Sequence, residues 1–202
     1  EYIYQDLTAC NKLIIKEDIE NLLKDDIRLE NYVDKAFKEL FFHIPQEEKP
    51  EYNGTQLINS AVIVRYIKQL LKHDLNYAPF TFVGTEMQVN EEISVQTSEG
   101  TFQSRIGGYI DRLDSKDGTL RIVDYKTGGK ADTPADVESL FIPDKKRSNY
   151  IFQTFLYAAI MSKKQDLKVA PSLLYIHRAA SDSYSPVVCL KEPRKPEIPV
   201  TD

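Results

Sequence analysis

The first third of the chain has the hydrophobic spacing of amphipathic helices. Apolar residues recur every three or four positions with charged residues between them, which places them along one side of a helix. The polar stretch 43–54, which contains two prolines and two adjacent glutamates, interrupts this pattern as a loop. We therefore predict helices before the loop and a further long helix over 56–73, and the apolar positions that define them are Ile19, Leu22, Leu23, Leu29, Val33, Ala36, Phe37, Leu40, Phe41, Leu57, Ala61, Val64, Ile67, Leu70 and Leu71.

From Pro79 onward the hydrophobic period changes to two, which is typical of strands. Strand residues alternate from Phe80 to Val95 and again over 103–113 and 119–127, so we predict three consecutive strands joined as an antiparallel meander. The segment 149–163 has a helical pattern with Ser148 as its cap, and 172–177 is a short apolar strand. The last residues are rich in proline and have no period, which predicts an extended tail.

This order of elements, helix, three strands, helix and strand, predicts an α/β fold with a central mixed sheet. We expect a helical region over 1–78, a core over 79–190 and an extended C-terminal tail over 191–202. The chain opens on Glu1, within a helical pattern and without an initiating methionine, and we interpret it as a piece of a longer protein.

Composition and charge narrow the function classes. The chain is 42% hydrophobic and 28% charged, as folded globular proteins are. Its 26 basic and 31 acidic residues give a net charge of −5, so any contact with nucleic acid must be local. No apolar run reaches the about 20 residues of a membrane helix, and no secretory signal opens the chain, so we expect a cytoplasmic protein with no membrane contact. The two cysteines are too few for a disulfide framework, a four-thiolate zinc site or an iron–sulfur cluster.

A hairpin in the second half brings carboxylates together. Asp117-Gly118 is a preferred loop for a type I′ turn, whose two central positions need positive φ. With this loop, Lys116 pairs with Thr119 and Asp111 stands directly across from Asp124. The same register puts Asp114 opposite Arg121 on the other face of the sheet. The apolar residues that share the face of the two aspartates are Leu113, Leu120 and Ile122.

Two aspartates placed in this way indicate a metal site. Their Cβ atoms would be only about 5 Å apart, and like charges so close are destabilising unless a cation lies between them. Lys126 points to the same face as Asp124, and the register puts it opposite Tyr109. The carbonyl oxygen of Tyr125 is a further candidate ligand, and such oxygen donors suit Mg²⁺ or Mn²⁺. The chemistry this favours is phosphodiester hydrolysis.

The alternative is that Asp111 and Asp124 are solvated residues on an exposed sheet face, with Lys126 as an ion-pair partner. The apolar neighbours count against this reading, because they predict a buried face on which unpaired carboxylates are costly. Gly107 and Gly108 lie beside this site, and either close access by a substrate or a bulge in the strand would explain them.

Three motifs in this order resemble the PD-(D/E)xK nuclease superfamily, and specifically its RecB- and AddB-like exonuclease domains. Residues 107–114 resemble the family's G-x-x-D-R-x-D strand, 124–128 its D-Y-K-T-G strand, and 153–157 its Q-x-x-x-Y helix. The resemblance covers roughly residues 80–177 and implies a restriction-endonuclease-like core.

The resemblance implies roles for individual residues. Asp111 and Asp124 would bind the metal ion and Lys126 would be the catalytic lysine. Gln153 and Tyr157 are one helical turn apart, so both can reach the site or the DNA beside it, with helix packing as the alternative. Two acidic residues enter more weakly: Glu86, whose alternative is an exposed strand residue, and Glu1, which would be the Glu of an upstream His-x-x-x-Glu helix whose His precedes this chain.

The resemblance also implies the partners and the activity. We expect a Mg²⁺-dependent deoxyribonuclease, with Mn²⁺ as a substitute ion, acting as an exonuclease module of a helicase–nuclease or DNA repair protein and working with a helicase domain or subunit. Local basic residues would contact phosphates, or form a solvated surface, and these are Lys145, Lys146, Arg147, Lys163, Lys164 and Arg178. The alternatives are a catalytically inactive module that binds DNA or a partner protein, and a hydrolase acting on another phosphate substrate.

Overall fold

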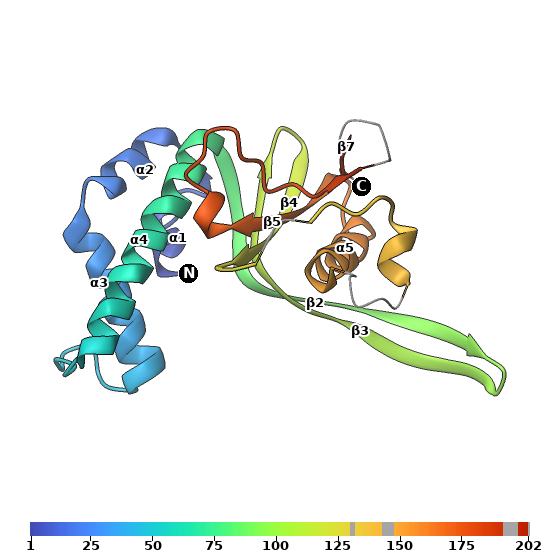
Figure 1. The fold of residues 1–202 in the computed structure, drawn as a ribbon, viewed down its shortest axis with the longest axis horizontal. Coiled ribbons are helices and arrows are strands. Elements are labelled where there is room, and N and C mark those ends of the chain that lie inside the picture. Colours follow the sequence, from blue (N-terminus) through green and yellow to red (C-terminus); the bar gives the residue numbers. More distant parts are fainter. Residues whose placement is uncertain (130–131, 143–147, 192–197, 202) are drawn as a thin grey trace. The chain divides into compact units, whose positions relative to one another are not determined.

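The computed structural model describes residues 1–129, 132–142, 148–191 and 198–201. The chain divides into two compact units, one formed by 1–80 with 176–184 and the other by 81–175 with 185–202. The helices and strands, most of which are labelled in Figure 1, are α1 (Tyr2–Leu7), β1 (Leu13–Ile14), α2 (Lys16–Leu23), α3 (Asp26–Ala36), the π-helix η1 (Phe37–Phe42), α4 (Gly54–Tyr77), β2 (Phe80–Thr97), β3 (Gly100–Lys116), β4 (Thr119–Lys126), the 3₁₀-helix η2 (Glu138–Phe141), α5 (Asn149–Ser162), β5 (Lys168–Tyr175), the 3₁₀-helix η3 (Ile176–Arg178), β6 (Cys189–Leu190) and β7 (Ile198–Pro199).

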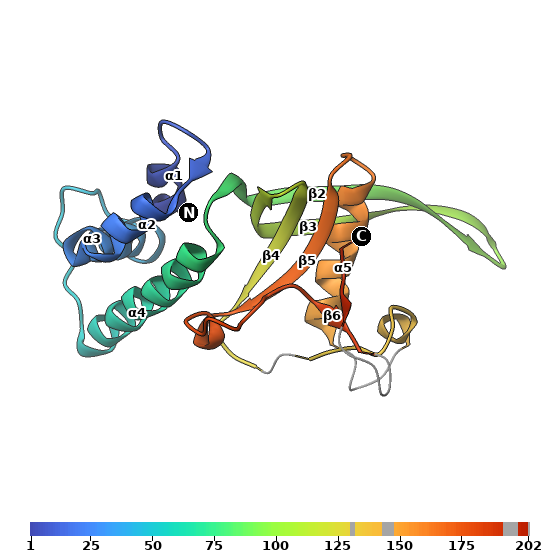
Figure 2. The same cartoon turned by 90° about the horizontal axis from the view of Figure 1, so that it is seen from above.

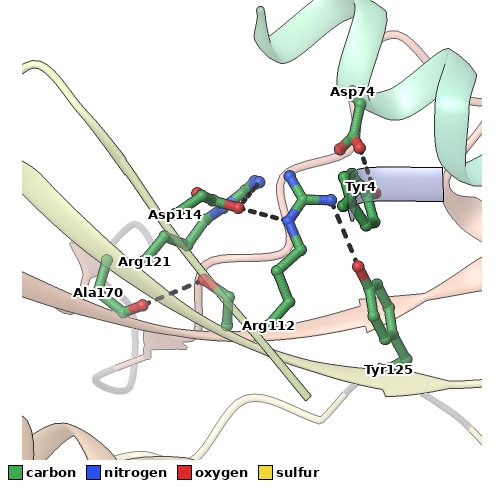
Figure 3. Close-up of polar contacts among 8 residues, drawn as sticks. Tyr4, Asp74, Arg112, Asp114, Arg121, Tyr125 and Ala170 are labelled. Atoms are coloured by element: carbon green, nitrogen blue, oxygen red, sulfur yellow. Dashed lines mark hydrogen bonds and ion pairs between the residues drawn. The ribbon is translucent and has the colours of Figure 1, made fainter. Parts of the chain in front are cut away.

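The first unit is helical, as its apolar spacing predicts. α2 and α3 pack against α4, and a hydrogen bond of 2.5 Å from Tyr4 Oη to Asp74 Oδ2 ties α1 to the end of α4 (Figure 3). Asn53 and Gln56 form a reciprocal capping box at the start of α4. The fully buried side chains that form its core include Ile14, Ile19, Leu22, Leu29 and Leu71.

Four strands in the order β2-β3-β4-β5 form the sheet of the second unit. β2, β3 and β4 are antiparallel neighbours and β5 is parallel to β4, which confirms the predicted meander and mixed sheet. The hairpin turn also has the expected conformation, because φ is +50° at Asp117 and +77° at Gly118 and Lys116 pairs with Thr119. The register of β3 against β4 is therefore the one the turn chemistry predicts.

One face of this sheet is covered by α5, as Figure 2 shows. Ser148 caps the helix by accepting a bond from the Ile151 N–H at 3.5 Å, as predicted. Tyr157 and Ile160 of α5 pack on the apolar side chains of the strands. The complete cluster is Val89, Ile110, Leu113, Leu120, Ile122, Tyr157, Ile160 and Val169, so the face predicted from alternation is buried.

β2 and β3 continue past β4 as a two-stranded arm (Figure 1). Their pairing extends to Thr97 and Gly100, and polar side chains join the strands at every second pair. These cross-strand contacts are Glu92–Arg105 at 3.2 Å, Ser94–Gln103 at 2.9 Å and Gln96–Thr101 at 2.9 Å. Because residues 94–105 are exposed, the arm is held together mainly by its own backbone and side-chain bonds.

The last strand of the core differs from its prediction. β5 begins at Lys168 instead of 172 and ends at Tyr175, so that His177 lies in η3. Pro171 lies within the strand, and its carbonyl accepts a bond of 2.9 Å from the Val188 N–H. The segment 186–188 thereby covers the outer edge of β5. Within the predicted tail, β7 pairs with β6.

The order α4, then β2-β3-β4, then α5 and β5 is the expected restriction-endonuclease-like order of elements, and the α/β fold class is confirmed. In the parts of the chain that the structure covers, no helix combines the length and apolar character that crossing a membrane requires.

Candidate functional site

The site lies where the sheet forks between β3 and β4. The β3–β4 ladder runs from Lys116–Thr119 to Arg112–Val123, and beyond it β3 stays with β2 while β4 stays with β5. Asp111 and Asp124 are the first residues past the last pair. Instead of continuing the ladder, the carboxylate Oδ2 of Asp111 accepts a bond of 2.8 Å from the backbone N–H of Tyr125.

The fork corrects the predicted register beyond the Arg112–Val123 pair. Asp111 was expected directly across from Asp124, but the ladder ends one position before them, and Asp124 pairs with Leu173 of β5. Lys126 was expected opposite Tyr109, but it pairs with Tyr175 of β5, whereas Tyr109 pairs with Gln88 of β2. The turn sets the register only where the two strands remain hydrogen bonded. β3 and β4 separate after the Arg112–Val123 pair, so the register does not extend to Lys126. Beyond the ladder, Asp111 bonds to β4 through its side chain, and Asp124 and Lys126 pair with each other on β4.

Asp124 and Lys126 form an ion pair on one face of β4, as their spacing predicts. Their side chains are only 9% and 17% exposed. Burial raises the pKa of Asp124; the bond and charge of Lys126 lower it, and the negative charge of Asp111 raises it further, so that the net pKa is raised. The two carboxylates therefore influence each other electrostatically.

The strand alternation shifts by one residue at Asp111. Ile110 and Leu113 belong to the same apolar cluster, although residues three apart in a regular strand point to opposite faces. The neighbouring pairs are Thr85–Arg112 and Met87–Ile110, and between them Glu86, which has a φ of +50°, and Asp111 are not paired. Such irregularities redirect side chains beside active sites. Here the irregularity turns Asp111 toward the fork.

The donors at the fork fit a small divalent cation. Asp111 and Asp124 supply two carboxylates, and Mg²⁺ is usually bound by about one or two protein carboxylates plus water and phosphate oxygens. The N–H of Tyr125 points toward β3, and because the carbonyl of a strand residue points to the same side as its N–H, the Tyr125 carbonyl oxygen also points toward β3, the strand of Asp111.

Among the residues with described positions, no group of three or more His, Cys, Asp or Glu side chains could hold a metal. Glu86, which is exposed, therefore does not join the pair.

Gln153 and Tyr157 of α5 contact each other. The amide Nε2 of Gln153 donates to Tyr157 Oη at 2.9 Å, and Tyr157 is buried in the apolar cluster with 4% of its surface exposed. No hydrogen bond among the described residues joins either side chain to Asp111, Asp124 or Lys126. Tyr157 therefore packs in the core of the second unit, and helix packing was the alternative to a role at the site for this residue. Gln153 is only half-buried.

The ring of Tyr157 also explains a glycine. A Cβ on Gly108 would lie 2.1 Å from Tyr157 Oη, and one on Gly107 would lie 2.0 Å from the Val89 carbonyl oxygen. Both glycines are therefore required by packing within the protein, a reason that neither the substrate-access nor the bulge interpretation included.

Gly108→Ala is expected to destabilise the fold, because the methyl group overlaps the Tyr157 hydroxyl. Overpacking of this kind costs about 1–3 kcal/mol in the free energy of unfolding, measured by urea denaturation. The double variant Gly108→Ala with Tyr157→Phe should recover part of that loss, since the nearest atom is then absent. Equal stability of the single and double variants would contradict this explanation of Gly108.

A buried charge network lies beside the fork and was only partly predicted (Figure 3). Arg121 forms two bonds of 2.9 Å with the carboxylate of Asp114, as the predicted pair requires, and Arg112 Nε adds a third at 2.7 Å. Arg112 Nη1 also donates to Tyr125 Oη at 3.3 Å. Burial raises the pKa of Asp114, but the two guanidinium groups outweigh it, and the net pKa is lowered. The spacing of Arg112 and Asp114 on one strand face was the available signal.

Tyr150 is a further residue that the sequence reading missed. The ammonium Nζ of Lys126 lies 4.1 Å from the centroid of its ring.

The described basic residues predicted to contact phosphates have partners within the protein. Lys163 pairs with Glu91 at 3.2 Å, and Lys164 donates to the Asn90 carbonyl at 2.8 Å. The cluster 145–147 lies outside the described residues. The guanidinium group of Arg178 lies over the ring of Tyr184. Glu1, the candidate for the glutamate of the upstream motif, accepts a hydrogen bond from the Gln5 side chain.

A mixed sheet with α5 on one face, and with two aspartates and a lysine at its fork, defines a restriction-endonuclease-like protein. The sequence matches the PD-(D/E)XK nuclease superfamily over residues 7–195, and the chain belongs to that superfamily. The superfamily predicted from the motifs is thereby confirmed, and membership implies a nuclease that hydrolyses DNA, in a class that generally uses divalent metal ions. The sequence matches no curated protein.

Proposed function

We propose that the chain is a metal-dependent DNA exonuclease module of a larger helicase–nuclease or DNA repair protein. The observation that carries the proposal is the convergence of Asp111, Asp124 and Lys126 at the fork of the sheet in a member of a nuclease superfamily. The exonuclease mode and the helicase partner rest on the likeness of the motifs at 107–114, 124–128 and 153–157 to RecB- and AddB-like domains.

In this proposal Asp111, Asp124 and the carbonyl oxygen of Tyr125 hold Mg²⁺, for which Mn²⁺ substitutes. The raised pKa of Asp124 supports the assignment, because burial and the charge of Asp111 both disfavour its ionised form and a cation between the carboxylates relieves this. The ion would supply Lewis-acid polarisation of the scissile phosphate.

Lys126 acts on the same phosphate. Its ammonium group lies within the fork beside Asp124 and is mostly shielded from solvent, where a positive charge stabilises developing negative charge more strongly than in water. The group is also suited to orient the attacking water. Gln153, held by Tyr157, lines the path of the DNA beside the fork, so that Tyr157 acts through Gln153.

Lys126→Ala is expected to retain cation binding and to lose most turnover, on the order of 10²–10³-fold in kcat, as for loss of one charge-stabilising donor. Calorimetric titration with Mn²⁺ measures the first property and initial rates on DNA the second. Lys168→Ala removes an exposed lysine at the far end of β5 and serves as the matched control. Unchanged turnover in Lys126→Ala would exclude the lysine from the chemistry.

The exonuclease mode is tested with end-labelled linear DNA and with closed circles of single- and double-stranded DNA, each with Mg²⁺. Degradation of linear DNA alone supports the proposal, with Lys126→Ala as the inactive control. Cleavage of circles would show an endonuclease. If no DNA is cut although Mn²⁺ binds, the chain is an inactive module that retains the fold.

A further inference from the structure

The ring of Tyr150 contacts the ammonium group of the proposed catalytic lysine. Tyr150 lies in the first turn of α5, and Lys126 Nζ is 4.1 Å from its ring centroid, well within the distance of a cation–π interaction. Tyr150 is 49% exposed, so about half of its surface is not used for core packing. Its interaction with Lys126 is the specific contact that the residue makes at the site.

Lys126 has two partners of different kinds. One is the carboxylate of Asp124, which in the proposed function also binds the cation. A carboxylate shared with a divalent ion holds a nearby ammonium group less strongly, since part of its charge is neutralised. The other partner is the Tyr150 ring, which binds no cation in the proposal.

We propose that Tyr150 is a positioning residue that holds the Lys126 ammonium group at the fork of the sheet during DNA hydrolysis. This inference rests on the proposed function and adds to it a residue outside the three motifs. Because Tyr150 acts through Lys126, its loss affects the rate of the bound complex more than the binding of DNA or of the cation.

The first test compares Tyr150→Leu, Tyr150→Phe and the control Phe141→Leu in steady-state DNA cleavage by the full chain. Phe141 is an exposed aromatic residue that packs on Phe152 of α5, so its replacement reports a general loss of aromatic surface. Tyr150→Leu is expected to lower kcat about 3- to 30-fold, as loss of a partly shielded cation–π contact does. KM and the melting temperature should stay unchanged, and Tyr150→Phe, which keeps the ring, should retain kcat.

Three outcomes would overturn the inference. Tyr150→Leu with unchanged kcat shows that the ring is not needed, and a change confined to KM makes Tyr150 a DNA contact. A loss in Tyr150→Phe equal to that in Tyr150→Leu assigns the effect to the hydroxyl group. These three outcomes are seen with active wild-type protein and leave the proposed function intact. If wild-type protein cuts no DNA, the proposed function itself fails, and the role of Tyr150 in hydrolysis fails with it.

The second test reads the contact itself, without activity. In proton NMR spectra of the metal-free chain, the Cε methylene protons of Lys126, assigned by their absence in Lys126→Ala, should be shifted upfield by the Tyr150 ring. The shift should persist in Tyr150→Phe and in Phe141→Leu and disappear in Tyr150→Leu. Lys126 signals at the position of exposed lysines in wild-type protein would overturn the proposed contact.

Discussion

Asp124→Ala is expected to abolish both divalent-cation binding and DNA cleavage. The substitution removes one of the two carboxylates at the fork and the ion-pair partner of Lys126. Metal-ion charge stabilisation contributes several kcal/mol to such reactions, so the rate should fall by at least about 10³-fold. Initial rates on linear DNA with Mg²⁺ and calorimetric titration with Mn²⁺ measure the two losses.

The same variant should keep its fold in the absence of metal. A raised pKa in the folded protein means that the ionised form of Asp124 opposes folding at neutral pH, so removing the group leaves stability equal or slightly higher. The control is Asp132→Ala, an exposed aspartate on the loop after β4. Unfolding of Asp124→Ala, or cleavage at the wild-type rate, would contradict the assignment of Asp124 to the metal site.

Asp114→Asn is expected to destabilise the protein more than any other substitution considered for the second unit. Asp114 is fully buried and takes bonds from Arg112 and Arg121, which are 0% and 3% exposed. An amide removes the negative charge that compensates both guanidinium groups, and breaking a buried ion pair costs about 3–5 kcal/mol. Urea denaturation followed by circular dichroism measures the loss.

The control for this variant is Asp117→Asn in the hairpin turn, a position with φ of +50° that asparagine also accepts, so the stability change should stay within about 0.5 kcal/mol. The pH dependence gives a second criterion. The pKa of Asp114 is lowered below 3.8, so its contribution is present above pH 3.8 and is lost as the pH falls through the folded-state pKa. Asp114→Asn should lack this acid-dependent loss. A wild-type-like acid transition in the variant would contradict the role of the ion pairs.

The sequence predicted the hairpin register and the buried face of the sheet, because both depend on interactions between residues that are close along the chain. The preference of Asp117-Gly118 for positive φ set the hairpin register, which in turn placed Asp114 opposite Arg121. The alternation of Leu113, Leu120 and Ile122 likewise predicted the buried face. These features depend on residues close in sequence or paired across one turn.

What the sequence did not show depends on contacts between distant elements. The need for glycine at 108 depends on the ring of Tyr157, which α5 places against the sheet. The contact of Tyr150 with Lys126 likewise joins two segments that no periodicity relates. The sequence also did not show that β5 begins at Lys168 or that the backbone of 186–188 bonds to this strand.

The arm formed by β2 and β3 implies a graded resistance to local unfolding. Its outer part carries exposed side chains, such as Val95 and Phe102 at 41% and 52% exposure, and a two-stranded hairpin alone is only marginally stable in water. Amide hydrogens near the turn at 97–100 should therefore exchange with solvent quickly, and protection should increase toward Ile110, which is buried. The carboxylates stand at the protected end of this gradient, so opening of the arm can occur without moving them.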